Sequence, residues 1–316
     1  MKKQQVLVCG VTGFIGRNIA ERLADKKNLE VFGTYYRTKP DRLLLAKNIK
    51  LVKTDLTDKS EVDKIVKGKD IIVQAAAVTS GSKDILTQPY IHVTDNAIMN
   101  SLIFKAAFKY KIKHVIFFSC TAMYPNQNKP VTEEDFNGQI TDKYFGVGWT
   151  KVYLEKMCEF FSKISTTKYT AIRHSNIYGP FDKYDLEHSH VMGATTAKVM
   201  TAKDKIVVWG DGSEARDLLY ISDLIDFVEI ILNNQKSSYE LINVGYGSAI
   251  SVASLVKKVV EISGKKIEIE FDISKPTIKF SLSLNIEKAE KVYNWKPKVT
   301  LEEGIKKTID WYRQNI

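Results

Sequence analysis

The sequence predicts an α/β protein built on a doubly wound parallel sheet, with a smaller α/β region toward its C-terminal end. Strand-like and helix-like patterns alternate over the first 174 residues, an order typical of a parallel sheet with helices on both faces. A glycine-rich turn, Gly10-Val11-Thr12-Gly13-Phe14-Ile15-Gly16, joins the first apolar strand to the first helix. A chain of 316 residues is long enough for such a domain and a smaller companion.

The hydrophobic pattern predicts the elements in chain order. Strands are expected over 6–9, 30–36, 50–54, 71–74, 114–119 and 169–174, and helices over 14–26, 58–67, 88–110 and 149–164. After Pro180 the pattern changes to shorter pieces, with a strand over 205–209 and helices over 222–233, 251–263 and 300–313. Ser222 and Thr300 are expected to be the N-caps of their helices.

The glycine-rich turn indicates a phosphate-binding loop. Gly10 permits a tight bend, Gly13 lets backbone N–H groups approach a pyrophosphate, and Gly16 allows close packing of the following helix, whose N-terminal dipole favours an anion. Such a pattern also occurs in ordinary turns, but the strand before it and the helix after it favour a dinucleotide site. This Rossmann-type site is assigned to Gly10, Thr12, Gly13, Phe14, Ile15 and Gly16. Residues 1–180, rejoined by 217–247, then form the dinucleotide-binding domain, and 181–316 form mainly a substrate-binding region.

The run after the second expected strand bears on the choice of cofactor. Dinucleotide sites place there either an acid on the adenosine ribose or a cation on its 2′-phosphate. Arg37 and Lys39 occupy this run, and no carboxylate precedes Asp41. NADP(H) is therefore the favoured cofactor and NAD(H) the alternative, while a solvated basic turn would be a purely structural explanation of Arg37. Further cofactor contacts are expected from Asp55, Leu56, Ala75, Ala76 and Ala77, which follow the third and fourth strands.

The formal charge of +10 does not by itself indicate nucleic-acid binding. The basic residues are spread along the chain without a cluster interleaved with aromatic residues, so we expect an anionic small ligand and no nucleic acid. No apolar run approaches the roughly 20 residues of a membrane span, and we expect no membrane partner. The three cysteines lack metal-type spacing and suit a reducing compartment, so we expect a cytoplasmic protein without a metal site.

Further motifs extend along nearly the whole chain. In order they are Ala75-Ala76-Ala77, Asn96, Ser119-Cys120-Thr121-Ala122-Met123-Tyr124-Pro125, Lys151, Asn176-Ile177-Tyr178-Gly179-Pro180, Ser189-His190-Val191, Val207-Val208-Trp209-Gly210 and Arg216-Asp217. With the glycine loop they resemble the extended short-chain dehydrogenase/reductases that act on nucleotide sugars (the NAD-dependent epimerase/dehydratase family), and within it most of all the GDP-L-fucose synthase branch. The resemblance implies an oxidoreductase that uses NADP(H) and a GDP-type sugar. It also implies a homodimer formed through the helices over 88–110 and 149–164.

The chain departs from the pattern of this family at the catalytic positions. The family places a tyrosine, which protonates the sugar oxygen, four residues before its lysine, but here Val147 stands four residues before Lys151. Cys120 replaces the family's Ser or Thr, and a thiol is a poor hydrogen-bond donor. Ala122 replaces a cysteine that assists C3/C5 epimerisation, and Thr121-Ala122 replaces the Asp-Glu pair of the 4,6-dehydratases. The expected reaction is therefore hydride transfer at C4 of a 4-keto-6-deoxy-type hexose or a related sugar.

Another side chain must then supply the proton. His190 is the first candidate, because it matches a histidine position of the family and an unperturbed imidazole has a pKa near 6.5. The alternatives are Thr121, Tyr124 and Tyr144, while Cys120 is expected to belong to the catalytic set by its position. Any of these side chains could instead make only structural hydrogen bonds. Lys151 is expected to bind the nicotinamide ribose, and an exposed helix lysine is the plainer interpretation.

A second set of residues is expected to contact the substrate. Arg216 and Lys198 are candidates for its diphosphate, since a guanidinium fork suits phosphate oxygens. The other expected substrate contacts are Asn176, His190 and Trp209. A structural ion pair with Asp217 is the alternative for Arg216. Arg173 and His174, at the end of the sixth strand, are expected to pack or to form ion pairs.

Two alternative functions follow from the same residues. Loss of the family's tyrosine and serine would suit a catalytically impaired NADP-binding regulator or partner subunit. The retained substrate-side residues His190, Lys198, Trp209 and Arg216 argue against it, because a regulator needs no such pocket. A nucleotide-sugar epimerase with tightly held cofactor is the other alternative, for which an acid directly after Tyr36 would be the expected sign.

Overall fold

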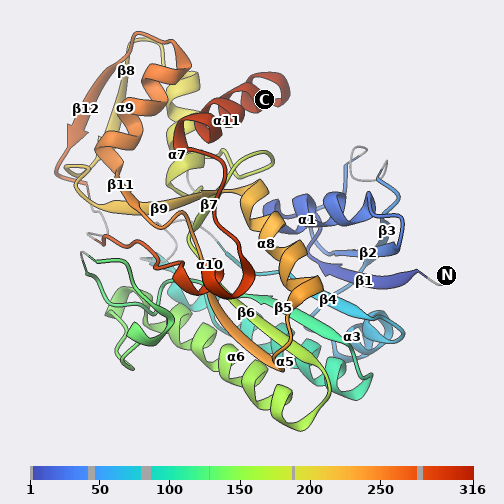
Figure 1. Cartoon of the computed structure of the whole chain (residues 1–316). Helices are drawn as coiled ribbons and strands as arrows, with labels where there is room; N and C mark the ends of the chain where they lie inside the picture. The colour runs from blue at the N-terminus through green and yellow to red at the C-terminus, as the bar shows by residue number, and fades with distance from the viewer. Residues whose placement is uncertain (1–2, 42–46, 80–86, 128, 187–188, 276–279) are drawn as a thin grey trace.

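A seven-stranded parallel sheet forms the centre of the protein (Figure 1). The computed structural model describes residues 3–41, 47–79, 87–127, 129–186, 189–275 and 280–316. The strands of this sheet are β1 (Gln4–Cys9), β2 (Leu29–Tyr35), β3 (Lys50–Lys53), β4 (Ile71–Gln74), β5 (His114–Phe118), β6 (Lys168–His174) and β10 (Tyr239–Val244). They lie in the order β10-β6-β5-β4-β1-β2-β3, and every neighbouring pair is parallel.

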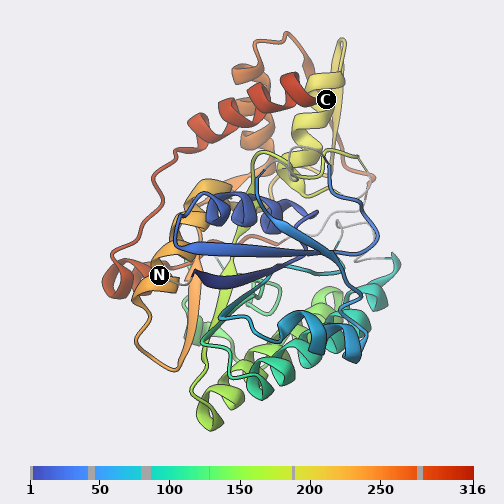
Figure 2. The ribbon, with the colours of Figure 1, turned by 90° about the vertical axis from the view of Figure 1, so that its right-hand side faces the viewer.

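Helices cover both faces of this sheet, as Figure 2 shows. α1 (Phe14–Ala24) and α8 (Ile221–Asn234) pack on one face, and α3 (Lys59–Val66), α5 (Thr94–Lys109) and α6 (Phe145–Ile164) pack on the other. Because strand side chains alternate between the faces, Val6 and Val8 of β1 lie in one core while Leu7 and Cys9 lie in the other, all fully buried. This architecture confirms the predicted doubly wound α/β fold.

The strand order creates a switch point beside β1. The chain passes outward from β1 through β2 to β3, and then returns to β4 on the other side of β1. In open α/β sheets, ligands bind outside the carboxyl ends of the strands at such a point, where the connections leave in opposite directions. The glycine-rich turn follows β1 directly and therefore lies at this position.

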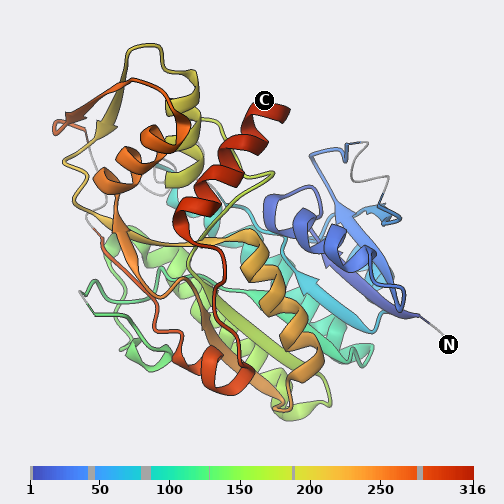
Figure 3. The same ribbon diagram turned by 45° about the horizontal axis from the view of Figure 1, so that its top comes forward.

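A smaller lobe adjoins the large sheet (Figure 3). It contains a three-stranded sheet of β7 (Asn176–Tyr178), β9 (Ala215–Tyr220) and β11 (Ala249–Ser251), and the parallel pair β8 (Lys205–Trp209) and β12 (Glu268–Asp272). Its helices are α7 (Val191–Thr201), α9 (Val252–Ser263) and α11 (Leu301–Asn315), which pack on one another. α10 (Glu287–Tyr293) instead packs against β10 and α8 of the large domain. The chain therefore crosses between the two lobes more than once.

Two predicted helices differ from the structure at their N-terminal ends. The segment 88–110 is divided into a 3₁₀ turn, η1 (Pro89–His92), and α5, which starts at Thr94. Proline can start a helical turn but donates no backbone hydrogen bond, and Val93 (φ −102°, ψ −72°) separates the two pieces. α6 begins at Phe145, four residues earlier than predicted, directly after the 3₁₀ turn η3 (Asp142–Tyr144). A third 3₁₀ turn is η2 (Glu133–Asp135).

The two predicted helix caps have different outcomes. Thr300 caps α11 as predicted, because its side chain accepts a hydrogen bond from the backbone N–H of Glu303. The prediction for Ser222 is wrong. β9 passes directly into α8 without a loop, so Tyr220 takes the cap position and Ser222 lies within the first turn.

Candidate active site

A cleft of about 1800 Å³ joins the two lobes at the carboxyl edge of the large sheet. It is called the main cleft below. The residues that the sequence assigned to cofactor, catalysis or substrate line it, except Gly16 and the alternative proton donor Tyr124. Within the described ranges, no three His, Cys, Asp or Glu side chains are grouped so that they could hold a metal ion. In those same ranges no helix combines the length and the apolar character needed to cross a bilayer.

The glycine loop is shaped by contacts that exclude side chains. Gly10 has φ +79°, and a Cβ there would lie 2.8 Å from the Cα of Ala76. A Cβ on Gly16 would lie 2.3 Å from the carbonyl oxygen of Gly10, so this glycine serves packing and does not line the cleft. Gly13 is the N-cap of α1, and no side chain caps that helix. The N-terminal turn of α1 at the cleft therefore fits the pyrophosphate of a dinucleotide.

The loop after β2 carries the predicted adenosine-side residues. Arg37 is exposed and lines the main cleft. Asp41 forms a bidentate ion pair with Arg17 of α1, whose guanidinium lies 3.6 Å from the ring centre of Phe181. Asp41 is the first carboxylate after β2, and it is therefore already paired with Arg17. Among the described residues of this loop, Arg37 is the charged side chain that lines the main cleft.

Asp55, which follows β3, has partners of its own. Its carboxylate accepts hydrogen bonds from the backbone N–H of Thr57 at 2.9 Å and from the Thr57 hydroxyl at 2.6 Å. These hydrogen bonds, with one from Tyr36, lower the pKa of Asp55. Asp55 and Leu56 line the cleft beside Arg37, and Ala75, Ala76 and Ala77 after β4 line it beside the glycine loop.

The positions of the missing tyrosine and serine lie in the same cleft as the lysine. Val147 is half-buried on the first turn of α6, one turn before Lys151. The Lys151 ammonium donates a hydrogen bond of 2.7 Å to the carbonyl oxygen of Phe118, and burial lowers its pKa. Burial raises the pKa of the Cys120 thiol, although the charge of Lys151 opposes this shift. Cys120 is thus a neutral thiol at pH 7, and its sulfur accepts a hydrogen bond from the Ala122 N–H.

Tyr144 and His190 approach the cleft with different neighbours. Tyr144 ends η3, and its ring packs edge-on against Phe280. Burial raises the pKa of its hydroxyl, the charge of Arg216 lowers it, and Cys120 is close enough to act on it. The His190 side chain is accessible but enclosed by the cleft walls, which lower its pKa, and its titratable neighbours are Lys183 and His92. Thr121 is half-buried beside Cys120.

Tyr124 is not in the site. It is buried, donates a hydrogen bond of 2.6 Å to Asn243 and accepts one from Arg173. It was an alternative proton donor in the sequence, but its hydroxyl belongs to the interior. Arg173 forms a buried bidentate ion pair with Glu155 at 2.7 and 2.9 Å, as predicted.

The substrate-side residues extend along the smaller lobe. The Lys198 ammonium donates to the carbonyl oxygen of Val207 at 3.0 Å and lies 5.7 Å from the ring centre of Trp209, which is 48% exposed. The Asn176 amide donates to the backbone oxygen of Asp217 at 3.3 Å. Arg216 donates to the backbone oxygens of Ala215 and Phe280.

Asp217 has a role different from the predicted alternative of an ion pair with Arg216. Its buried carboxylate accepts backbone hydrogen bonds from Tyr246, Gly247 and Leu284, so it ties β9 to two other segments. Burial raises the pKa of Asp217 to about 6. The hydrogen bonds explain how this carboxyl group is tolerated inside the protein.

Among the further residues that line the main cleft are three titratable ones that sequence reasoning did not select for it. They are His174, Asp182 and Glu214. Burial raises the pKa of Asp182 to about 7. Among the described residues, Oδ2 of Asp182 and Oε2 of Glu214 are buried without a hydrogen-bond partner. Asp182 lies two residues after the Asn-Ile-Tyr-Gly-Pro motif, which was the available signal. His174 gave no signal, because a residue at a strand end reads as part of the core.

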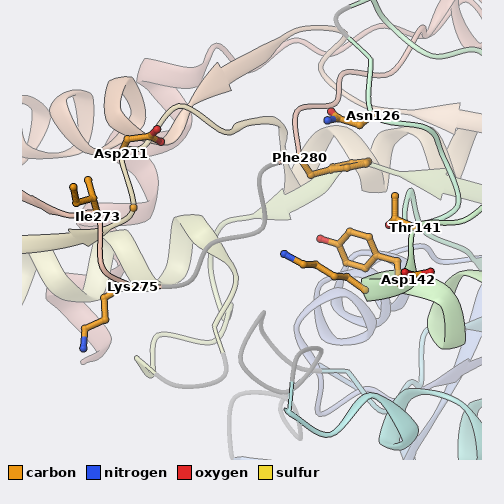
Figure 4. A pocket seen from close by; sticks show the side chains of 10 residues that line it. Asn126, Thr141, Asp142, Asp211, Ile273, Lys275 and Phe280 are labelled. Atoms are coloured by element: carbon orange, nitrogen blue, oxygen red, sulfur yellow. The ribbon is translucent and has the colours of Figure 1, made fainter.

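A side cavity of about 700 Å³ adjoins the main cleft (Figure 4). Asn126, Thr141, Asp142 and Phe280 form one wall, and Asp211, Ile273 and Lys275 lie opposite. Tyr144 and Phe280 line both spaces. Their edge-on ring pair therefore separates the side cavity from the part of the main cleft that holds Cys120.

Together, the parallel sheet with its switch point, the glycine turn and the cleft between two lobes define a Rossmann-type α/β protein. The chain belongs to the NAD dependent epimerase/dehydratase family, whose model matches residues 6–245. It is 31% identical over 274 residues to a GDP-L-fucose synthase of Sinorhizobium fredii, covering 84% of this chain and 86% of that protein. It is 28% identical over 318 residues to a GDP-L-colitose synthase of Yersinia pseudotuberculosis, covering 98% and 97%.

Solved structures share the fold over the full chain. The UDP-glucose 4-epimerase of Thermotoga maritima superposes with a TM-score of 0.88 at 24% identity, covering 98% of this chain and 99% of that one. Pal from Bacillus thuringiensis superposes with a TM-score of 0.86 at 26% identity, again covering 98% and 99%. The shared fold therefore includes the part of the smaller lobe that lies beyond residue 245, where the match to the family model ends.

Proposed function

We propose that this protein is an NADP(H)-dependent oxidoreductase of nucleotide sugars, which transfers hydride at C4 of a 4-keto-6-deoxy-type hexose carried on GDP. The observation that carries the proposal is the main cleft, which is continuous from the glycine loop to the substrate-side residues Lys198 and Arg216. One end suits a dinucleotide and the other an anionic sugar nucleotide. The relatives named GDP-L-fucose synthase and GDP-L-colitose synthase support the choice of GDP.

The preference for NADP(H) rests on the loop after β2. Arg37 lines the cleft there, and the carboxylate of Asp41 is already paired with Arg17. A ribose 2′-hydroxyl would need an acidic acceptor, whereas a 2′-phosphate needs a cation. Titration should therefore give a lower Kd for NADPH than for NADH, and Arg37→Ser should reduce the difference. Equal Kd values in the wild-type protein would overturn this preference and leave NAD(H), the cofactor in the family's name.

When bound, the cofactor supplies the hydride, and the chain must orient the sugar and supply a proton. Lys151 is proposed to hold the nicotinamide ribose and Arg216 the diphosphate. Tyr144 is the proposed proton donor, because its hydroxyl shares the surroundings of Cys120 and Arg216 and keeps its proton at neutral pH. His190, the first choice from sequence, has Lys183 and His92 as its titratable neighbours and is the second candidate.

Binding tests the proposal before turnover does. Thermal shift and calorimetric titration would compare GDP-, dTDP-, CDP- and UDP-hexoses with the corresponding free nucleotides, in the presence of NADPH. A GDP-hexose is expected to stabilise the protein more than GDP alone. Arg216→Gln should weaken the GDP-hexose and leave NADPH unaffected, because Arg216 is on the substrate side. If no sugar nucleotide exceeds its free nucleotide, the enzyme proposal fails.

A second candidate function is a cofactor-binding regulator or partner subunit without turnover. Val147 and Cys120, in place of the family's tyrosine and serine, favour it. The same titration distinguishes such a regulator from the proposed enzyme. NADPH would bind with normal affinity while every sugar nucleotide failed to add stability.

We also propose that the protein forms a homodimer through α5 and α6. These helices leave large apolar side chains exposed, namely Ile98, Phe108, Phe145, Trp149, Tyr153, Phe160 and Ile164. Exposed apolar side chains on two helices that pack on each other suit a contact with a second copy of the chain. Light scattering should give a dimer mass, and Phe160→Glu should reduce it to the monomer. Val292→Glu, at an exposed apolar position on α10, is the control that should remain dimeric.

A further inference from the structure

His174 lies at the carboxyl edge of the sheet and not in its core. It is the last residue of β6 and lines the main cleft together with Lys151 and Phe118. Its ring packs edge-on against Phe118 at the end of β5, with 6.0 Å between ring centres. Lys151 and His190 are its titratable neighbours. The imidazole therefore lies in the cleft near Lys151 of α6 and near His190, which precedes α7.

One nitrogen of this imidazole is fixed by the backbone. Nδ1 lies 2.8 Å from the carbonyl oxygen of Ser175, and because a carbonyl only accepts, Nδ1 must carry the hydrogen. Burial lowers the pKa of His174 to about 4, so the ring is neutral at pH 7. Nε2 is then an acceptor. Nε2 has no hydrogen-bond partner among the described residues, and it is not among the described side-chain atoms that are both fully buried and unpaired. Because His174 lines the main cleft, Nε2 faces that cleft.

The order of strands determines which part of a dinucleotide would meet His174. Arg37 and Asp55 follow β2 and β3, the glycine loop follows β1, and beyond it come β4, β5 and β6. A dinucleotide whose pyrophosphate lies at the glycine loop and whose adenosine lies over β2 must extend its nicotinamide half toward β4, β5 and β6. His174 stands at that end of the cleft.

We propose that His174 is a cofactor-binding residue whose Nε2 accepts a hydrogen bond from the carboxamide N–H₂ of the nicotinamide. The carboxamide is the hydrogen-bonding group of the nicotinamide ring, so holding it fixes how the ring lies beside the sugar. The fixed tautomer makes this contact specific, since a carboxamide N–H₂ needs an acceptor and a protonated imidazole would offer none. A neutral ring also avoids placing a positive charge beside the cationic oxidised nicotinamide. The inference rests on the proposed use of a nicotinamide cofactor.

A cofactor analogue tests the contact in the wild-type protein. In the 3-acetylpyridine analogue of NADP⁺ a methyl group replaces the carboxamide NH₂, so the donor is lost. A net hydrogen bond of typical strength predicts a Kd about 3- to 10-fold higher for the analogue than for NADP⁺. The same comparison in His174→Phe should show no penalty, because the acceptor has been removed. His174→Gln, which retains a side-chain oxygen acceptor, should restore part of the difference.

A fragment without nicotinamide serves as the control. ADP-ribose 2′-phosphate, which is NADP⁺ without its nicotinamide, should bind wild type and His174→Phe with equal Kd, because this fragment does not reach residue 174. If His174→Phe weakens this fragment as much as NADP⁺, His174 has only a structural role and the inference is wrong. It is also wrong if wild type binds NADP⁺ and its acetyl analogue equally well. If NADP⁺ and NADPH do not bind at all, the failure belongs to the proposed cofactor and not to His174.

Discussion

Val147→Tyr tests whether the cleft is still organised around a proton donor at this position. Residue 147 lies one turn before Lys151 on α6 and lines the main cleft, so the new phenol would project into open space and not into the core. Four residues of helix rise about 6 Å, and the ammonium of Lys151 would lower the pKa of the phenol beside it. A well-placed general acid contributes about 10²- to 10⁴-fold, or about 3–5 kcal/mol of barrier.

The gain expected in this protein is smaller, because Tyr144 is proposed to supply part of that effect already. We expect kcat to rise about tenfold or more, which corresponds to about 1.4 kcal/mol. The assay is NADPH oxidation followed at 340 nm with a GDP-4-keto-6-deoxyhexose. Val147→Phe is the matched control, since it adds the ring without the hydroxyl.

The outcome that refutes the reasoning is equally specific. If Val147→Tyr and Val147→Phe have the same kcat while both bind NADPH as tightly as wild type, residue 147 is not near the reacting oxygen. The carry-over of the family's catalytic register to α6 would then be wrong. A lower kcat in both variants would show only that the ring blocks the cleft.

Three other predictions concern the site and the fold. Tyr144→Phe should lower kcat by about 10²-fold or more with little change in the NADPH Kd, whereas a loss of that size in His190→Gln alone would move the proton donor to His190. Gly16→Ala should raise the NADPH Kd about tenfold or more, because the added Cβ would lie 2.3 Å from the Gly10 carbonyl oxygen; an unchanged Kd would contradict the loop geometry. Burial lowers the pKa of His114 to about 4, so the unfolded state binds more protons between pH 6.5 and 4 and stability falls by up to about 3 kcal/mol as the pH drops through that window. Urea unfolding of His114→Gln should lack this component, and a pH dependence identical to wild type would show that His114 is not the group responsible.

The glycine loop could be predicted because its signals are local. A strand, three spaced glycines and a helix follow one another directly in the sequence, and each has its own role in binding a pyrophosphate. The contact that forbids a side chain at Gly10 was not predictable, because it involves Ala76, 66 positions away. The sequence thus predicted the kind of site, while its exact shape depends on how β4 packs beside β1.

Errors occurred where local patterns do not determine tertiary position. Ser222 is a good capping residue, but β9 runs directly into α8, so the cap position falls on Tyr220. The sequence places His174 at the buried end of a strand. The alternation of side chains along a strand does not show whether its last residue extends beyond the helices that cover the sheet. Tyr124 stands in a catalytic-looking turn, yet its hydroxyl turns inward to Asn243. The positions of His174 and Tyr124 depend on neighbours that are distant in sequence, whereas the error at Ser222 came from placing a loop where β9 and α8 are continuous.

The contacts of Lys151 explain what its retention means in a chain without the family's tyrosine. A lysine kept only to acidify a phenol four residues earlier would have no partner here, because that residue is Val147. Lys151 instead remains in the main cleft and donates to the carbonyl oxygen of Phe118, although burial disfavours its charge. A buried ammonium is costly unless it is well paired, and one carbonyl contact with a cation–π contact 4.7 Å from the ring centre of Phe117 offsets only part of that cost. The proposed contact with a cofactor ribose would supply a stronger reason, and in the proposed enzyme hydride transfer is kept while the proton comes from another side chain.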